Sequence, residues 1–163
     1  MEISDLDRLI AIEAVKRLKS RRDRALDTKD WATFRSLHAP EHESANDGFA
    51  SWKGRDTLVE RSMALLSGMT TVHQCHTPDI VIDAPDRASA VWYLEDQLYW
   101  TQDDEEHWIH GFGFYHERSE RRDGEWVFTH RRLQRTLLFA SPGAEHPAIA
   151  GAKAAGVFRA GHR

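Results

Sequence analysis

The stretch Thr71-Val-His-Gln-Cys-His-Thr-Pro-Asp-Ile-Val-Ile82 marks the change from helical to extended spacing of apolar residues. Before it, apolar residues recur every three to four positions. After it, they alternate with polar residues or form short β-branched runs, as strands do. Asp123-Gly124 between two apolar runs is a strong hairpin signal. The expected strands lie near residues 70–83, 87–100, 107–121 and 125–138, with turns at 84–87 and 122–125 and a polar tip at 102–106.

The N-terminal part of the chain is predicted to be helical. From Ser4 to about Asp27 the apolar residues recur at helical spacing, and Ser4 with Asp7 three residues later is typical of a helix cap. Two shorter helices are expected at Asp30–Leu37 and Arg55–Leu66, and the polar stretch Ala39–Gly54 is expected to be a loop that could include one short strand. Helices followed by antiparallel strands indicate an α+β fold, with the helices gathered on one side of a curved sheet.

Length and composition limit the class of protein. A chain of 163 residues suits one domain, and a net charge of −4 argues against nucleic acid as a partner. No apolar stretch approaches a membrane span and no export signal is apparent, so we expect neither. The single cysteine, Cys75, suits a reducing cytoplasm. We expect residues 1–140 to form the α+β domain and residues 141–163, rich in Ala, Gly and Pro, to be a tail that is mobile or acts as a flap.

Asp27 and His73 are the first candidates for a catalytic role. Asp27 closes the long predicted helix and His73 opens the first predicted strand. A carboxylate that fixes one imidazole nitrogen leaves the other free to accept a proton, which is the minimal machinery of a general base. If the two side chains meet, the protein performs proton chemistry without a cofactor. Arg22 lies on the buried stripe of the same helix, where it either meets an anion or extends to the helix edge.

The run His73-Gln-Cys75-His76 also has the residue types of a metal site. Alternation along a strand places His73 and Cys75 on one face and His76 on the other, so one strand cannot present all three to a metal. Cys75 lacks an evident polarising context, which argues against a nucleophile. We therefore expect no metal.

Several short motifs together resemble one family. They are Ala25-Leu-Asp-Thr-Lys-Asp-Trp31, Trp52-Lys-Gly-Arg55, Thr71-Val-His73, and Glu120-Arg-Arg-Asp-Gly-Glu-Trp126 followed by Arg131. Over residues 4–138 the chain resembles the SnoaL-like group of the nuclear transport factor 2-like superfamily, which includes scytalone dehydratase, bile acid 7α-dehydratase and hexachlorocyclohexane dehydrochlorinase. The resemblance implies a cystatin-like cone, with N-terminal helices packed in the concavity of a strongly curved, mostly antiparallel sheet. It also favours a homotrimer over a dimer.

The resemblance assigns roles to individual residues. Asp27 and His73 match the catalytic pair, and Arg131 matches a cavity arginine, although the adjacent Arg132 leaves the register open by one. Arg22 and Asp96 match positions that carry functional side chains in other members. Two positions depart from scytalone dehydratase, because Trp92 stands in place of a second catalytic histidine and Leu26 in place of a tyrosine. These departures argue against a scytalone-like substrate.

Strand alternation predicts what surrounds the pair. Trp92, Leu94 and Asp96 share one face of their strand; Gly111, Gly113 and Tyr115 share another, as do Val127, Thr129 and Arg131. Glycines on a concave strand face leave room for a ligand. With the inward face taken from the resemblance, the side chains around His73 form an apolar, aromatic pocket with a few charges, a common form of small-molecule site. The expected pocket residues are Trp92, Leu94, Asp96, Tyr115 and Arg131.

The leading functional hypothesis is a cofactor-independent lyase that removes water from a hydrophobic, ring-bearing small molecule of aromatic or steroid catabolism. His73 acts as the base, Arg131 and Arg22 stabilise negative charge, and Asp96 or Tyr115 holds or protonates the leaving oxygen. Carbon–carbon cleavage such as deformylation, or a cyclase-like isomerisation, would use the same pocket. A second class is non-catalytic: the small subunit of a ring-hydroxylating dioxygenase, or a ligand-binding protein.

Overall fold

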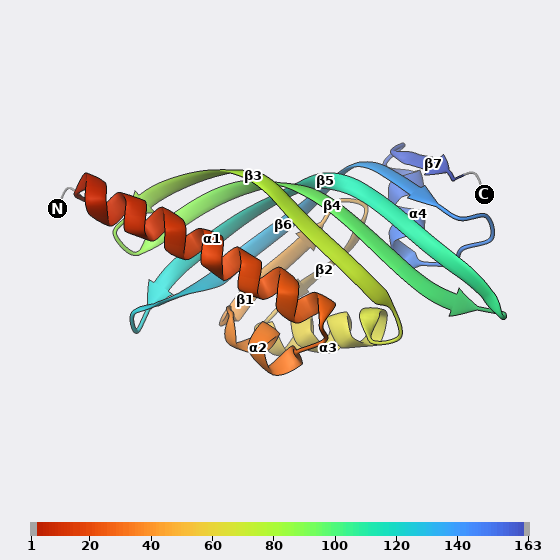
Figure 1. Cartoon of the computed structure of the whole chain (residues 1–163), viewed down its shortest axis with the longest axis horizontal. Coiled ribbons are helices and arrows are strands. Elements are labelled where there is room, and N and C mark those ends of the chain that lie inside the picture. Colours follow the sequence, from red (N-terminus) through yellow and green to blue (C-terminus); the bar gives the residue numbers. More distant parts are fainter. Residues whose placement is uncertain (1–2, 162–163) are drawn as a thin grey trace.

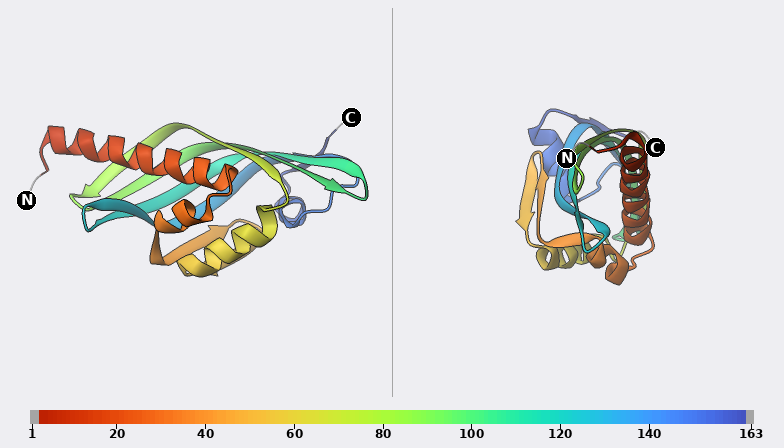
Figure 2. Two further views of the ribbon diagram at one scale, coloured as in Figure 1. Left: turned by 60° about the horizontal axis from the view of Figure 1, so that its bottom comes forward. Right: turned by 90° about the vertical axis from the view of Figure 1, so that its left-hand side faces the viewer.

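In the computed structural model, which describes residues 3–161, one strongly curved sheet wraps around the interior and helix α1 runs along its open side. The end-on view shows that the sheet does not close into a barrel, because α1 occupies the gap (Figure 2). Helices α2 and α3 lie together at the lower edge in Figure 1. The helices are α1 (Asp5–Asp27), α2 (Trp31–Ser36), α3 (Arg55–Leu66) and α4 (Pro147–Ala154). The strands are β1 (His38–Asn46), β2 (Phe49–Lys53), β3 (Thr70–Ala84), β4 (Arg87–Gln102), β5 (Glu105–Arg122), β6 (Glu125–Ala140) and β7 (Phe158–Ala160).

The predicted helices are confirmed together with their caps. Ser4 accepts a hydrogen bond from the backbone of Asp7 at the start of α1, and Asp30 does the same for Thr33 at the start of α2. Helix α1 buries one stripe of side chains against the sheet, while its N-terminal turns extend beyond the sheet (Figure 1). None of the helices within residues 3–161 has both the length and the apolar character of a membrane span.

The sheet has the strand order β2-β1-β6-β5-β4-β3, with β7 added beside β6. Neighbours are antiparallel except that β1 and β7 run parallel to β6, so the predicted α+β, mostly antiparallel architecture is confirmed. The two predicted hairpins that join β4 to β5 and β5 to β6 have left-handed turn residues. These are Asp103 (φ 52°) with Asp104 (φ 62°), and Asp123 (φ 51°) with Gly124 (φ 85°), as expected of type I′ turns.

The prediction of a loop at residues 39–54 is wrong. This segment forms β1 and β2, and β1 lies between β2 and β6 inside the sheet. The reason is that its inward side chains are polar: His42 and Ser44 are buried and hydrogen-bonded to β6. A strand whose buried positions are polar gives none of the apolar alternation by which strands are recognised in a sequence.

The prediction that Val127, Thr129 and Arg131 share one face of β6 is also wrong. Trp126 and Phe128 are buried beside Arg131, whereas Val127 and Thr129 are not. The register with β5 shifts at Thr129, where one extra residue on β6 forms a bulge and reverses the side-chain phase. The bulge lets β6 present core aromatics at one end and a buried arginine further along.

The segment after Ser141 forms α4 and β7 and packs on β6. Ile149 and Ala152 of α4 are buried in a second hydrophobic cluster with Leu98, Ile109 and Leu138 of the sheet. This helix extends the core at the end of the molecule away from the N-terminus (Figure 1). The expectation of a mobile or flap-like tail stays a prediction.

Candidate active site

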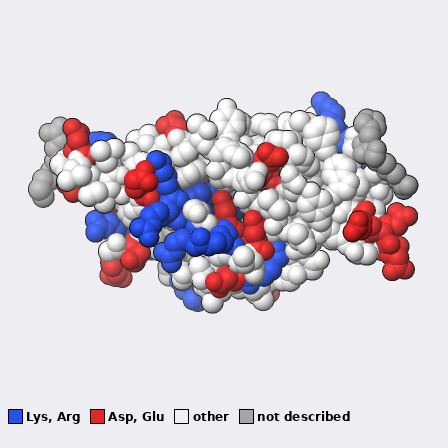
Figure 3. Space-filling model, in the orientation of Figure 1, with Lys and Arg blue, Asp and Glu red and all other residues white. Residues whose placement is uncertain are grey.

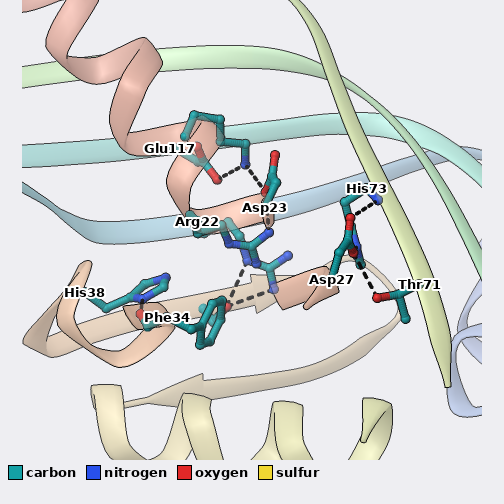
Figure 4. A network of polar contacts seen from close by, with 11 residues as sticks. Arg22, Asp23, Asp27, Phe34, His38, Thr71, His73 and Glu117 are labelled. Carbon is teal, nitrogen blue, oxygen red and sulfur yellow. Dashed lines mark hydrogen bonds and ion pairs between the residues drawn. The ribbon is translucent and has the colours of Figure 1, made fainter. Parts of the chain in front are cut away.

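The structure brings Asp27 and His73 together, as the sequence predicts. Nδ1 of His73 lies 2.7 Å from Oδ1 of Asp27, and the backbone N–H of His73 donates to Oδ2 at 2.8 Å (Figure 4). Because a carboxylate only accepts hydrogen bonds, Nδ1 carries the proton and Nε2 is left as the basic nitrogen of the neutral ring. Asp27 is the last residue of α1, where the helix dipole disfavours a carboxylate, so its position serves the pair rather than the helix.

Two further side chains hold Asp27 in place. The hydroxyl of Thr71 donates to Oδ1 of Asp27 at 2.8 Å and accepts a hydrogen bond from Nζ of Lys29 at 2.7 Å. Lys29 has left-handed backbone (φ 60°) directly after α1, which turns its side chain back toward β3. The Asp27 carboxylate therefore has three hydrogen-bond donors from β3 and a nearby cation, Lys29, on its far side.

The pair lines a groove of about 430 Å³ between α1 and the β3 and β4 strands. Lys19 and Trp92 also line it, as does Cys75, whose thiol pKa is raised by burial. A groove of this volume suits a small molecule. His76 lies on the other face of β3, where its side chain is half exposed, so alternation along this strand is as predicted.

The interior behind the groove holds a buried charge cluster, defined as Lys19, Arg22, Asp23, Glu117 and Arg131. Nζ of Lys19 lies 2.7 Å from Glu117 Oε1 and 3.7 Å from Asp23 Oδ1, and Nη1 of Arg22 lies 2.8 Å from the same Asp23 oxygen (Figure 4). The three cations lie 4.1 to 5.5 Å from the ring centroid of Tyr115. Burial opposes the charge of Lys19, but Asp23 and Glu117 reverse this effect and raise its pKa.

Arg131 rather than Arg132 faces the interior, which settles the register. The guanidinium of Arg131 donates to Ser44 Oγ at 2.9 and 3.1 Å and to Asn46 Oδ1 at 2.9 Å. Arg132 is exposed and pairs with Asp47 on the surface. No carboxylate within residues 3–161 forms an ion pair with Arg131; its direct partners are neutral oxygens and the Tyr115 ring, and Glu117 favours its charge from a greater distance.

Asp96 has a partner that the sequence analysis did not foresee. Arg135 of β6 donates to both Asp96 oxygens, at 2.7 and 2.6 Å. Burial alone would raise the pKa of Asp96, but the charge and hydrogen bonds of Arg135 lower it below its usual range. Asp96 is thus held ionised, which argues against the expected role of protonating a leaving oxygen. Gly111 makes the pair possible, since a Cβ there would meet both charged groups; the room beside this glycine belongs to the ion pair, not to a ligand.

The expected pocket residues are all buried, but they do not all line the groove. Trp92 does, whereas Leu94 and Tyr115 are packed in the main hydrophobic cluster between α1 and the sheet. Four charged interior residues are absent from the predicted site, although their spacing places each on the same face as a residue predicted to be inward. Lys19 lies four residues after Val15, Asp23 four residues after Lys19, Glu117 two residues after Tyr115, and Arg135 four residues after Arg131.

Two other buried histidines differ from His73. Nδ1 of His38 donates to the carbonyl of Phe34 at 2.7 Å, and Nδ1 of His42 donates to that of Phe128 at 3.1 Å. Burial lowers the pKa of His42 to about 3 and that of His38 well below its usual value. These rings are held neutral by carbonyl partners and the surrounding core.

Comparisons with known proteins identify the family and the fold. The sequence model of the SnoaL-like domain matches residues 7–132. Among solved structures, a scytalone dehydratase-like protein of Novosphingobium aromaticivorans is 18% identical, covering 83% of this chain and 90% of that one, with a TM-score of 0.71. A hexachlorocyclohexane dehydrochlorinase of Novosphingobium barchaimii is 20% identical, covering 88% and 98%, with a TM-score of 0.71. A cystatin-like protein of unknown function from Nostoc punctiforme is 20% identical, covering 83% and 95%, with a TM-score of 0.63. At these identities the likeness establishes the fold.

Proposed function

This chain belongs to the SnoaL-like domain family, and on that premise we propose that it is a cofactor-independent lyase that eliminates water from a hydrophobic, ring-bearing small molecule. The observation that carries the proposal is the hydrogen-bonded pair of Asp27 and His73 in a groove of small-molecule size. The pair supplies an oriented base whose free nitrogen needs no metal or cofactor to accept a proton.

The reaction begins at the carbon next to an activating carbonyl group. Nε2 of His73 removes a proton there, and Asp27 stabilises the imidazolium that forms. The electrons of the broken C–H bond form a carbon–carbon double bond, and the neighbouring C–O bond breaks. The departing oxygen takes up the proton, so water leaves and His73 returns to its neutral form.

The buried charge cluster supplies the second part of the catalysis. A base of this kind contributes ~10²–10⁴ in rate, so stabilisation of the developing negative charge must supply much of the rest. Arg22 and Arg131 are fixed by hydrogen bonds before any substrate arrives, and preorganised charge in a low dielectric is effective because little reorganisation is needed. With Asp96 committed to Arg135, the leaving oxygen is served by His73 itself.

The same base would also serve carbon–carbon cleavage or a cyclase-like isomerisation, and the mass of the product separates these outcomes. A non-catalytic role, as a dioxygenase small subunit or a ligand carrier, does not require the carboxylate–imidazole pair or the Thr71 and Lys29 contacts that orient it. These contacts favour the enzyme over the structural subunit.

The test is a panel of ring-bearing β-hydroxy ketones and acids incubated with the wild type and with His73→Ala, followed by mass spectrometry. We expect loss of water from at least one compound with the wild type and none with the variant at equal concentration. Loss of a one-carbon fragment would identify the carbon–carbon lyase instead. A panel compound that reacts equally well with His73→Ala would contradict the mechanism.

We also propose that the protein assembles as a homotrimer through the outer face of the sheet. That face carries Tyr93 and Tyr99, which are 57% and 43% exposed, and the ring of Tyr93 lies 4.7 Å from that of Phe114. Exposed aromatic side chains on adjacent strands are typical of an interface. Light scattering at micromolar concentration tests the assembly, and a monomer or dimer would contradict it.

A further inference from the structure

The groove is lined by one buried hydrogen-bond donor that lacks an acceptor, on Trp92, and by Lys19, which has N–H donors to spare. The indole Nε1 of Trp92 is buried with no partner among residues 3–161, and the residue as a whole is only 4% exposed. Lys19 has three N–H donors, of which one bonds Glu117. Nζ of Lys19 lies 5.9 Å from the centroid of the Trp92 ring, and both side chains line the groove beside His73. Because a buried donor without an acceptor is destabilising, a ligand oxygen placed here would be strongly favoured.

The charges around these donors are not balanced. The buried charge cluster contains three cations and two carboxylates, each residue at most 7% exposed. The other interior pair, Asp96 with Arg135, is neutral as a whole. Asp27 is partly exposed outside the cluster, and Lys29 reaches it through the hydroxyl of Thr71. One positive charge in excess therefore remains inside the described part of the chain. An uncompensated buried charge is costly, and one negative charge on a ligand would cancel it.

The charges on the outer surface also favour a negatively charged ligand. Although the whole chain has a net charge of −4, residues 16–24 of α1 contain six cations and one carboxylate. Figure 3 shows Lys and Arg gathered over this part of α1, on the face that the groove opens to. Arg24 lines the groove, and no carboxylate in residues 3–161 pairs with it. Such a cationic rim raises the local concentration of an anion and speeds its association.

From these observations we propose that the inner end of the groove binds the carboxylate of a ring-bearing organic acid, held by Lys19 and the indole N–H of Trp92. The carboxylate oxygens accept from both donors, and its charge balances the buried charge cluster. The ring of the acid lies along the groove toward His73. This inference rests on the proposed function, for which it narrows the substrate to a hydroxylated, ring-bearing acid; the binding site itself is testable without turnover.

The experiment compares two probes that share one ring system and nearly the same shape, of which one is an anion that only accepts hydrogen bonds and the other is a neutral amide. Binding of 2-naphthoate and of 2-naphthamide is measured by titration calorimetry at neutral pH, where the acid is ionised and the amide is not. We expect the acid to bind at least about tenfold more tightly, because a hydrogen bond to a charged group is worth more than one to a neutral group. Equal affinities, or no binding of either probe, would overturn the proposal.

Two variants locate the site. Trp92→Phe removes the unpartnered N–H while keeping an aromatic ring, and should lower the affinity for 2-naphthoate by about tenfold. The smaller ring also loses core packing, so the melting temperature of this variant should fall moderately, and binding is compared at a temperature where both proteins are folded. The matched control is Trp108→Phe, on β5 beside Ser141, which should leave the affinity unchanged. An unchanged affinity in Trp92→Phe would overturn the site.

The charge contribution needs a double variant. Lys19→Met alone would leave Glu117 buried without its cation, so Lys19→Met is combined with Glu117→Gln. The double variant keeps one cation in excess but loses the Lys19 donor, so its preference for the acid should fall by roughly fivefold. An unchanged preference would overturn the role of Lys19. Neither probe has a leaving group, so these results stand whether or not the protein is a lyase. Conversely, acid-selective binding without loss of water from any panel compound would contradict the lyase and leave this site in place.

Discussion

Two aspartate pairs lie side by side in this fold and are built for opposite purposes. His73 on β3 and Asp96 on β4 are direct partners in the strand register, so the Asp27–His73 pair and the Asp96–Arg135 pair occupy adjacent positions of one sheet. The side chain of Asp27 is 23% exposed and lines the groove, whereas that of Asp96 is 3% exposed and is covered by a bidentate guanidinium. The first pair is therefore accessible from the groove, whereas the second contacts only other parts of the protein.

The difference lies in the cation. An imidazole exchanges its proton near neutral pH, so a carboxylate beside it orients a group that can change charge during a reaction. A guanidinium keeps its charge throughout, and two parallel hydrogen bonds fix its geometry. The same acidic side chain is therefore part of a catalytic base in one position and part of the interior structure in the other.

The largest expected effect is on turnover, at the first pair. His73→Ala and Asp27→Asn should each lower kcat by roughly 10²–10⁴ on the substrate that the panel identifies, because the base or its orienting partner is lost. Circular dichroism should show an unchanged fold. An Asp27→Asn variant that keeps wild-type turnover would mean that this carboxylate does not orient the base.

The next effect is on stability, at the second pair. Asp96→Ala should lower the free energy of unfolding by about 3–5 kcal/mol, because it leaves Arg135 buried and uncompensated. Urea unfolding measures this directly. The control is the double variant Asp96→Leu with Arg135→Met, which removes both charges and should recover most of the loss.

A double variant as unstable as Asp96→Ala would show that the hydrogen bonds, not the isolated charge, carry the stability. An Asp96→Ala protein that keeps its stability but loses all turnover would reverse the assignment of the two pairs.

Much of the fold could be predicted because its helix ends and turns depend on short stretches of sequence. The caps at Ser4 and Asp30 and the Asp123-Gly124 turn each depend on a few neighbouring residues, and all are present as expected. Strand β1 could not be predicted in this way, since His42 and Ser44 are polar yet buried and bond only to residues far away in the sequence. Its position inside the sheet depends on the parallel pairing with β6, which no local pattern encodes.

The residues of the candidate site also differ in how far local sequence predicts them. Asp27 and His73 were found because one terminates a helix and the other begins a strand, and the resemblance supplied their pairing. The choice between Arg131 and Arg132 depends on the bulge at Thr129, which inverts the facing of the residues between it and a second bulge at Thr136. Lys19 was not predicted to be buried, although it falls on the buried stripe of α1. A lysine is almost never fully buried unless it has partners, and its partners Glu117 and Asp23 are known only from the structure.

A smaller effect concerns the two histidines that are held neutral. The pKa of His42, about 3, and that of His38, also lowered, lie below the unfolded value near 6.5. Between these limits the unfolded chain binds more protons, so stability is full above about pH 6.5 and falls as the pH drops. From pH 7 to pH 5 His42 should cost about 2 kcal/mol of unfolding free energy, and His38 should add a loss of the same sign.

Urea unfolding at the two pH values measures the loss. The matched variant His42→Asn keeps a donor for the carbonyl of Phe128 but does not titrate, so the loss between the two pH values should be about 2 kcal/mol smaller than in the wild type. A wild type equally stable at both pH values would show that these rings are not held neutral.

The smallest effect separates orientation from chemistry at the first pair. Thr71→Val keeps the shape of the side chain but removes the hydroxyl that links Lys29 to Asp27. A hydrogen bond of this kind is worth about 1 kcal/mol, so kcat/KM should fall by roughly fivefold while the pair itself persists. Thr70→Val, an exposed neighbour on the same strand, is the control and should have no effect. If Thr71→Val were as damaging as His73→Ala, Asp27 would owe its position to Thr71 rather than to the backbone N–H of His73, which donates to its second oxygen. If it were silent, that backbone contact and Nδ1 would be sufficient to orient the carboxylate, and the base would be held by β3 alone.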